Sequence, residues 1–151
     1  MNLAKIMIPK ISTVFLYETN TVRQGMETML RHGYTALPVL NSADQYIGCI
    51  SEGDFLRHLL SVGTTDKKAQ EKYTIAPLLR RDFCPALTID APQDEVVSLL
   101  LKQNFLPITD DRGYLCGIVT RQGIIRYLSE EMKNDPPAPT RLSMLKDDAL
   151  S

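Results

Sequence analysis

Short β-prone runs alternate with helical stripes along the first part of the chain. Residues 13–16 (Thr-Val-Phe-Leu) predict a short strand, which the polar stretch 17–21 ends. Apolar side chains at helical spacing follow, namely Val22, Met26, Met29 and Leu30. They predict one helix with a single apolar stripe. Thr21 is placed to cap the start of this helix and Gly33 to end it.

A strand pair and a second helix complete this first pattern. Residues 37–40 (Leu-Pro-Val-Leu) predict a buried strand, residues 41–44 a turn, and residues 46–50 a strand that returns antiparallel. A helix is expected from about residue 52 to residue 60. The order is therefore βαββα, with two helices covering one face of a small sheet.

The same pattern occurs twice. A shift of 69 residues places Leu37-Pro38-Val39 on Leu106-Pro107-Ile108 and gives five identities over residues 37–59, where ordinary composition gives about one or two. In the second copy, residues 86–89 predict the first strand, and a helix opens at residues 90–92 with Pro92 in its first turn. Pro107 leaves room for only about three turns, so we expect this helix to be shorter than its counterpart.

The repeat divides the chain into four parts. We expect a first unit at residues 5–62, a polar linker at 63–74, a second unit at 75–130 and a tail at 131–151. Residues 75–79 are predicted to form a lead-in helix that packs across the first unit. In the tail, residues 133–139 predict a solvated break, and residues 140–151 either a short helix or a disordered segment.

Composition and charge limit the classes of partner. The 151 residues carry 17 basic and 18 acidic side chains, a net charge of −1, which argues against nucleic-acid and membrane-surface binding. Three cysteines are too few for a disulfide framework and favour a reducing, cytoplasmic setting. Pro9 breaks the N-terminal apolar run, and no run of 18 apolar residues occurs. We therefore expect no signal peptide and no membrane span.

A family resemblance follows from the repeat and its motifs. Two βαββα units, each with Leu-Pro-Val/Ile and then a Gly-apolar-apolar-Ser/Thr step, resemble a pair of cystathionine-β-synthase (CBS) domains, a Bateman module, over residues 5–130. Residues 48–54 (Gly-Cys-Ile-Ser-Glu-Gly-Asp) match the family's nucleotide motif. The resemblance implies an α/β (α+β) fold of two units related by a pseudo-twofold axis, two clefts for adenosine-containing ligands, and a homodimer.

The stand-alone pair is similar to the cyclic-di-AMP-binding CBS proteins of Gram-positive bacteria. The likeness rests on residues 33–39, the shortened helix and residues 117–121. It implies a non-enzymatic sensor whose nucleotide masks a surface for a partner enzyme, such as a stringent-response alarmone synthetase. Carried over by residue, the ligand contacts are Ser12, Val14, Tyr34, Thr120 and Arg121. Family members can carry Lys at position 12 and Arg at position 122, where this chain has Ser12 and Gln122.

Ser51 and Asp54 have two interpretations. Ser51 precedes the second helix, so its hydroxyl and the first free N–H groups suit phosphate oxygens, while Asp54 can accept hydrogen bonds from ribose hydroxyls. Alternatively, the pair forms a capping box without a ligand. The repeat favours the ligand interpretation, because Gly48 leaves space for a sugar or ring beside the backbone.

The second copy differs at this motif. Thr120 keeps the hydroxyl, but Gly123 stands at the position of Asp54. Arg121 offers a charged donor for phosphate, and a cation at a helix start opposes the helix dipole, which favours an anionic partner. One cleft is therefore expected to hold ribose and the other phosphate.

Tyr34 precedes a segment expected at the mouth of the cleft, which supplies Thr35, Ala36 and Pro38. Its ring can stack on a purine, although a half-buried core tyrosine fits the spacing equally well.

Other functions remain open. Asp54 is compatible with a sensor of AMP, ADP, ATP or S-adenosylmethionine, and Gly123 with a ligand-free dimerisation unit. An enzyme ranks last, because Cys84 with His32 or His58 lacks an oxyanion motif. The cysteines and histidines show no paired spacing for a metal, so we expect no metal site and no cofactor beyond the regulatory nucleotide. Cys49 and Cys116 are expected to act as small buried apolar side chains.

Overall fold

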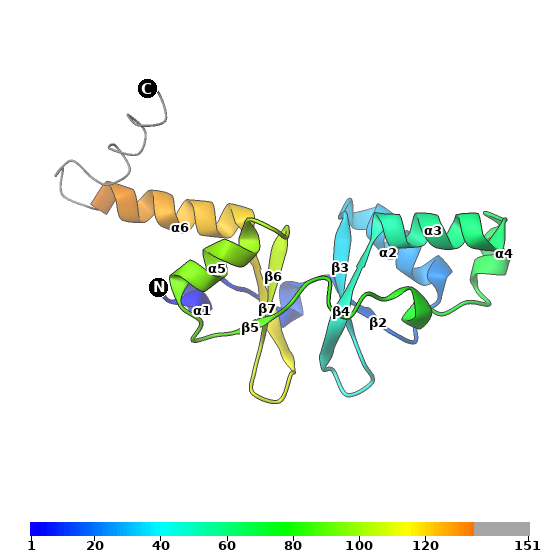
Figure 1. The fold of residues 1–151 in the computed structure, drawn as a ribbon, viewed down its shortest axis with the longest axis horizontal. Helices are drawn as coiled ribbons and strands as arrows, with labels where there is room; N and C mark the ends of the chain where they lie inside the picture. The colour runs from blue at the N-terminus through cyan, green and yellow to red at the C-terminus, as the bar shows by residue number, and fades with distance from the viewer. Residues whose placement is uncertain (135–151) are drawn as a thin grey trace, which may run out of the picture.

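Two similar units lie side by side in the computed structural model, which describes residues 1–134 (Figure 1). The first unit contains β2 (Leu16–Tyr17), β3 (Ala36–Leu40), β4 (Tyr46–Ser51), α2 (Val22–His32), α3 (Glu52–Val62), α4 (Lys67–Gln70) and the 3₁₀ helix η2 (Ala76–Leu78). Its sheet has the order β2-β3-β4, with β2 parallel and β4 antiparallel to β3.

The second unit repeats this plan. It contains α1 (Leu3–Ile6), β1 (Ile8–Pro9), β5 (Leu87–Thr88), β6 (Phe105–Thr109), β7 (Leu115–Thr120), α5 (Gln93–Leu100) and α6 (Arg121–Asn134). The 3₁₀ helix η1 (Lys10–Ser12) follows β1, and the sheet order is β1-β7-β6-β5. The predicted α/β (α+β) fold of two βαββα units is therefore confirmed.

The first long helix forms as its sequence predicts. Thr21 accepts a hydrogen bond from the Gln24 N–H, the Gln24 side chain returns one to the Thr21 backbone, and Gly33 ends α2 in the left-handed conformation. Val22 and Met29 are buried against the sheet. Leu30 is 76% exposed, so the prediction that it belongs to the apolar stripe was wrong. It lies one residue beyond Met29, about 100° further around the helix, and faces away from the sheet.

Two boundaries differ from the sequence predictions. The first strand, predicted at residues 13–16, forms at Leu16–Tyr17, because the residues before Leu16 belong to the segment that crosses from the second unit. The helix predicted to open at residues 90–92 begins at Gln93, so Pro92 is the N-cap of α5 and not part of its first turn. The predicted shortening of this helix is confirmed, since α5 has 8 residues and α2 has 11.

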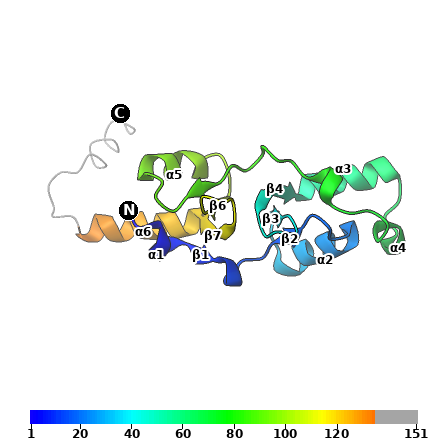
Figure 2. The same cartoon turned by 90° about the horizontal axis from the view of Figure 1, so that it is seen from below.

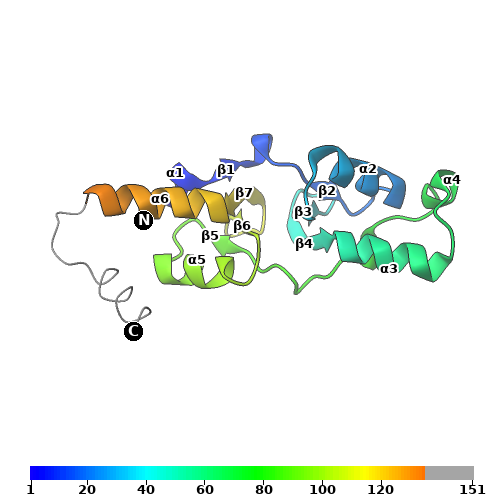
Figure 3. The same cartoon turned by 90° about the horizontal axis from the view of Figure 1, so that it is seen from above.

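The lead-in segments are exchanged between the units. Leu3 is buried in the second core, and β1 pairs antiparallel with β7, placing Ile8 opposite Ile118. Conversely, Ile75 is buried in the first core, as the sequence predicts for residues 75–79. The two crossing segments run on opposite sides of the contact between the sheets (Figures 2 and 3). The sequence did not predict that the N-terminus packs on the second unit.

Two glycines at equivalent repeat positions admit the crossing segments. A Cβ at Gly117 would lie 2.1 Å from the Ile8 carbonyl oxygen, and one at Gly48 would lie 2.8 Å from the Arg80 carbonyl oxygen. Gly48 also has a φ of 146°. The space beside Gly48 is therefore filled by the chain's own backbone, and its interpretation as room for a sugar or ring was wrong.

The linker contains a polar residue that packs inside the molecule. Gln70, on α4, is 2% exposed and lies 2.8 Å from the ring of His58 on α3. Its amide donates to the Thr64 carbonyl oxygen at 3.0 Å. In the tail, α6 continues to Asn134, past the start of the predicted break at residue 133. The rest of the tail prediction lies outside the described residues.

Candidate functional site

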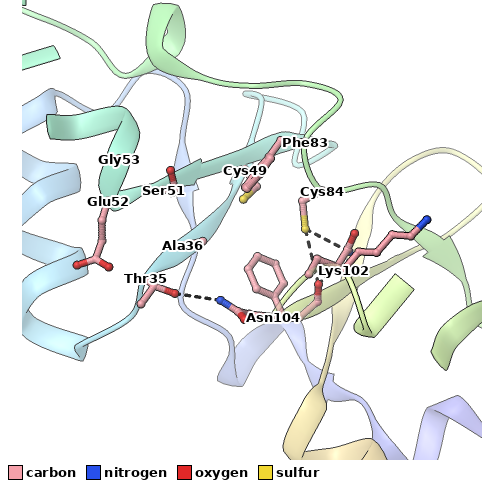
Figure 4. Close-up of a pocket in the computed structure, with 12 residues that line it drawn as sticks. Thr35, Ala36, Cys49, Ser51, Glu52, Gly53, Phe83, Cys84, Lys102 and Asn104 are labelled. Carbon is pink, nitrogen blue, oxygen red and sulfur yellow. Dashed lines mark hydrogen bonds between the residues drawn. The ribbon is translucent and has the colours of Figure 1, made fainter. Parts of the chain in front are cut away.

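Two cavities flank the contact between the sheets. The linker-side cavity, of about 280 Å³, lies between the start of α3, the inter-unit segment and the start of β6. Figure 4 shows its lining, which includes Ser51, Glu52, Phe83, Cys84 and Lys102. The N-terminal-side cavity, of about 190 Å³, is bordered by the other crossing segment, β3 and β7. Each crossing segment thus borders one cavity.

The two cavities share a wall. Thr35, Ala36, Asn104 and Phe105 line both of them. The Asn104 side-chain amide donates a hydrogen bond to the Thr35 hydroxyl at 3.2 Å. Thr35 and Asn104 are 69 residues apart, as are Ala36 and Phe105, so this wall pairs equivalent positions of the two copies. The repeat offset was the signal that could have found Asn104, which sequence reasoning missed.

Asp54 is fully engaged within the protein. Its carboxylate accepts hydrogen bonds from the Ser51 N–H at 2.8 Å and the Ser51 hydroxyl at 3.0 Å, and Ser51 completes the capping box by accepting from the Asp54 N–H. Arg57 and Arg80 contact the other carboxylate oxygen at 2.5 and 3.0 Å. Asp54 is 5% exposed and does not line the linker-side cavity. The capping box therefore forms, and a ribose would have to displace an arginine.

Ser51 itself reaches the linker-side cavity. Its hydroxyl also accepts a hydrogen bond from Arg80 at 3.1 Å. The guanidinium of Arg80 stacks on Phe83, 3.6 Å from the ring centroid. Lys102, from the loop after α5, adds a second cation. Phe83 and Lys102 lie outside the repeat motifs, so sequence reasoning did not select them.

The N-terminal-side cavity gathers most of the carried-over residues. Its lining includes Ser12, Val14, Tyr34, Thr35, Ala36, Pro38 and Thr120. Tyr34 is 49% exposed, and its ring is parallel to the ring of His32 at 5.9 Å. The Thr120 hydroxyl accepts a hydrogen bond from the Gly123 N–H, which caps the start of α6. Ile8 and Ile118 add apolar surface between these polar groups.

Arg121 lines neither cavity. Its Nε donates to the Leu100 carbonyl oxygen at 2.6 Å and its Nη2 to the Leu101 carbonyl oxygen at 3.3 Å, so it caps the C-terminus of α5. Its Nη1 donates to the Asn104 side-chain oxygen at 3.0 Å. A cation is favourable at a helix C-terminus, which offsets its unfavourable place at the start of α6. The helix dipole therefore no longer favours an anionic partner for Arg121, and its role as a phosphate donor stays a prediction.

Residues 1–134 contain neither a cluster of metal-ligating side chains nor a membrane-spanning helix. No group of three or more His, Cys, Asp or Glu side chains in this part of the chain is arranged to hold a metal ion. No helix within the same residues combines the length and apolar character needed to cross a bilayer.

Equivalent positions meet along an axis between the units, and a cavity lies on each side of it. This arrangement defines a tandem-repeat binding module of the kind the sequence motifs indicate. The chain belongs to the CBS-domain family, because the CBS domain matches residues 3–61 and 79–130.

Known proteins are similar to this chain in sequence or in fold. The uncharacterized protein MK0525 of Methanopyrus kandleri is 32% identical over 128 residues, covering 76% of this chain and 61% of its own length. Cyclic di-AMP receptor B of Bacillus subtilis is 20% identical over 115 residues, covering 76% of this chain and 78% of its own length. The crystal structure of Listeria monocytogenes CbpB in complex with c-di-AMP superposes with a TM-score of 0.77 at 21% identity, covering 89% of this chain and 100% of that one. The chain thus spans less than two thirds of the Methanopyrus protein.

Proposed function

We propose that the chain is a non-enzymatic regulatory protein that binds an adenine nucleotide, with cyclic di-AMP favoured, and signals its occupancy to a partner protein. The observation that carries the proposal is the lining of the N-terminal-side cavity, where Ser12, Tyr34 and Thr120 converge from three distant segments. The likeness to Cyclic di-AMP receptor B and to the CbpB structure with c-di-AMP supports this ligand.

The lining suits the parts of such a ligand. Tyr34 offers an exposed ring for stacking on adenine, and Ile8 and Ile118 offer apolar contact with a base. Thr120 lies at the start of α6, where free N–H groups attract phosphate oxygens. Since the net charge is −1, no general positive field draws an anion, and these local groups must hold it.

The size of the cavity implies a change on binding. Its volume of about 190 Å³ is below the roughly 300–1,000 Å³ of typical ligand pockets. The wall between the cavities is the contact that can give way, because the bond from Asn104 to Thr35 is exposed at the surface. Opening this wall joins the two cavities, and that movement is the change we propose the partner senses.

We also propose that the protein forms a homodimer through α3 and α6. Leu56 and Ile125 are equivalent repeat positions on these helices and are 59% and 64% exposed, and Leu60, one turn after Leu56, is 75% exposed. Exposed apolar side chains gathered on one face mark association surfaces. A partner enzyme, such as an alarmone synthetase, is the proposed receiver of the signal.

A mononucleotide or S-adenosylmethionine in the linker-side cavity is the second candidate. Ser51, Lys102 and the aromatic ring of Phe83 line that cavity and offer phosphate and base contacts. Ribose binding at this site requires Asp54 to lose its contact with Arg57 or Arg80 and to accept hydrogen bonds from the ribose hydroxyls. A dimerisation unit without a ligand is the third.

A thermal-shift and calorimetry series with cyclic di-AMP, AMP, ATP, NAD and S-adenosylmethionine tests these candidates. A ligand at 100 times its Kd adds about 2.7 kcal/mol of stability, which raises Tm by roughly 5–10 °C for a chain of this size. Tyr34→Ala should abolish most of the cyclic di-AMP shift. Tyr114→Ala, at a tyrosine that is 37% exposed and lines neither cavity, should preserve it. Failure of every adenine nucleotide to shift Tm would overturn the proposal.

A further inference from the structure

Two cysteines from distant parts of the chain meet on the wall of the linker-side cavity. Cys49 lies in β4 and Cys84 in the inter-unit segment, and the two pack with Phe105 in one apolar cluster. They are 1% and 2% exposed, yet both line the cavity (Figure 4). Neither is joined in a disulfide. The β-bridge between Cys49 and Arg80 holds the inter-unit segment alongside β4 just before Cys84.

The two sulfurs have different surroundings. The Gln103 amide donates a hydrogen bond to the Cys84 sulfur at 3.3 Å, and the Cys84 thiol donates to the Phe105 carbonyl oxygen at 3.6 Å. The neighbouring Cys49 side chain and, less strongly, the Tyr46 hydroxyl lower the pKa of Cys84, although burial opposes this. The neighbouring Cys84 side chain and burial raise the pKa of Cys49. Cys84 is therefore the thiol that ionises first and attacks an oxidant.

We propose that Cys49 and Cys84 form a reversible intramolecular disulfide when a small peroxide enters the linker-side cavity. The Cys84 thiolate attacks one peroxide oxygen, the O–O bond breaks, and hydroxide leaves and takes up a proton to become water. Cys84 is then a sulfenic acid. The Cys49 sulfur loses its proton, attacks the Cys84 sulfur and displaces a second water. Two thiols and one hydrogen peroxide thus yield one disulfide and two waters.

The disulfide joins β4 to the inter-unit segment. Cys49 is two residues before Ser51 on one wall of the linker-side cavity, and Cys84 follows Phe83 on another. The bond fixes these walls to one another, which makes the cavity's shape depend on oxidation. The thiol chemistry itself does not depend on which nucleotide the protein binds.

The remaining cysteine provides an internal control. Cys116 is half-buried, lines neither cavity, and its thiol donates to the Tyr114 carbonyl oxygen at 3.7 Å. Burial raises its pKa. Cys116→Ser therefore leaves the proposed pair intact and removes the residue most able to form an intermolecular disulfide.

The test treats the full chain and its Cys116→Ser variant with one equivalent of hydrogen peroxide. We expect the free thiols under denaturing conditions to fall from three to one in the wild type and from two to none in the variant. The mass of each protein should fall by two hydrogens, and a tryptic digest should link residues 32–57 to residues 82–102. Dithiothreitol should reverse all three changes.

Three results would overturn the proposal. They are retention of both thiols, a sulfinic acid at Cys84 with Cys49 still free, and a disulfide that includes Cys116 or joins two chains. Because the mapping uses the wild-type protein, it does not depend on whether a Cys49 or Cys84 variant folds. Nucleotide binding is measured separately, by titration of the oxidised protein. Failure of the disulfide proposal can therefore be distinguished from failure of the proposed function.

Discussion

Asn104 donates its side-chain amide to the hydroxyl of Thr35, the residue at the equivalent position in the other repeat. The same relationship occurs at the opposite end of the contact, where Gln45 forms a β-bridge with Tyr114, again 69 residues on. Around that bridge the Tyr46 N–H donates to the Gly113 carbonyl oxygen at 2.9 Å and the Leu115 N–H to the Asp44 carbonyl oxygen at 3.4 Å. A pseudo-twofold axis therefore runs between the units, and the wall between the cavities lies on it.

The side chain of Asn104 has two roles that substitution can separate. Asn104→Ala removes the donor to Thr35 and the acceptor for Arg121, and we expect a loss of about 1 kcal/mol. Asn104→Asp keeps the acceptor and removes the donor, so it should be less destabilised. In calorimetric melts the alanine variant should lose about 2–4 °C in Tm. Equal melting temperatures for both variants and the wild type would show that the wall contributes no stability.

Arg121 should act mainly as the cap of α5. Arg121→Ala leaves the Leu100 and Leu101 carbonyl oxygens without their charged donor, and a loss of about 1–2 kcal/mol is expected. Arg126→Ala, at an exposed arginine on the same helix, should change stability by less than about 0.5 kcal/mol. Urea unfolding of the two variants provides the comparison. Stability unchanged in Arg121→Ala, together with lost nucleotide binding, would instead restore the phosphate role.

Gly117 should tolerate no side chain. An alanine there places Cβ 2.1 Å from the Ile8 carbonyl oxygen, so β1 must move and its pairing with β7 weakens. We expect a cost of about 1–3 kcal/mol, as for other overpacked sites. Gly53→Ala is the matched control, since its Cβ meets nothing closer than Arg57 at 3.5 Å and it lies in α3, where alanine is the better helix former. Amide exchange at Ile8 and Ile118 should rise in the first variant alone.

Asp54 should prove more important for stability than for nucleotide binding in the N-terminal-side cavity. Asp54→Ala removes the carboxylate that Arg80 contacts, and it also removes half of the capping box. We expect the free energy of unfolding to fall by about 2–4 kcal/mol. Ser51→Ala, which loses only the cap hydroxyl, should cost about 1 kcal/mol. Denaturant unfolding measures both. Calorimetry in which Asp54→Asn loses all nucleotide affinity while keeping stability would favour the ribose interpretation.

The proposed dimer depends on the apolar faces of α3 and α6. Leu60→Lys and Ile125→Lys place charges where those faces would meet, and both should shift the protein to monomer in light scattering after gel filtration. Leu30→Lys is the control, because Leu30 is 76% exposed but belongs to α2 and not to α3 or α6. A wild-type protein that is monomeric at micromolar concentration would contradict this part of the proposal.

The sequence determined the local structure and the symmetry. Neighbours in the chain determine the features of α2, so these could be predicted without tertiary contacts. They are the apolar stripe with Val22 and Met29, the N-cap at Thr21 and the C-terminal end at Gly33. The offset of 69 residues fixed the two units and the family in the same way. Local spacing also allowed a capping box at Ser51 and Asp54, but it could not choose between the cap and a ligand.

Only the tertiary structure decided which groups face one another. Arg121 meets the end of α5, Gly48 meets the backbone of Arg80, and Cys49 meets Cys84, all through contacts between segments more than 20 residues apart. Such contacts depend on how the crossing segments pack, and a charge or a small residue in the sequence does not reveal its partner. Because the lead-in segments are exchanged, each crossing segment borders one cavity. That arrangement is the physical basis of the proposed site.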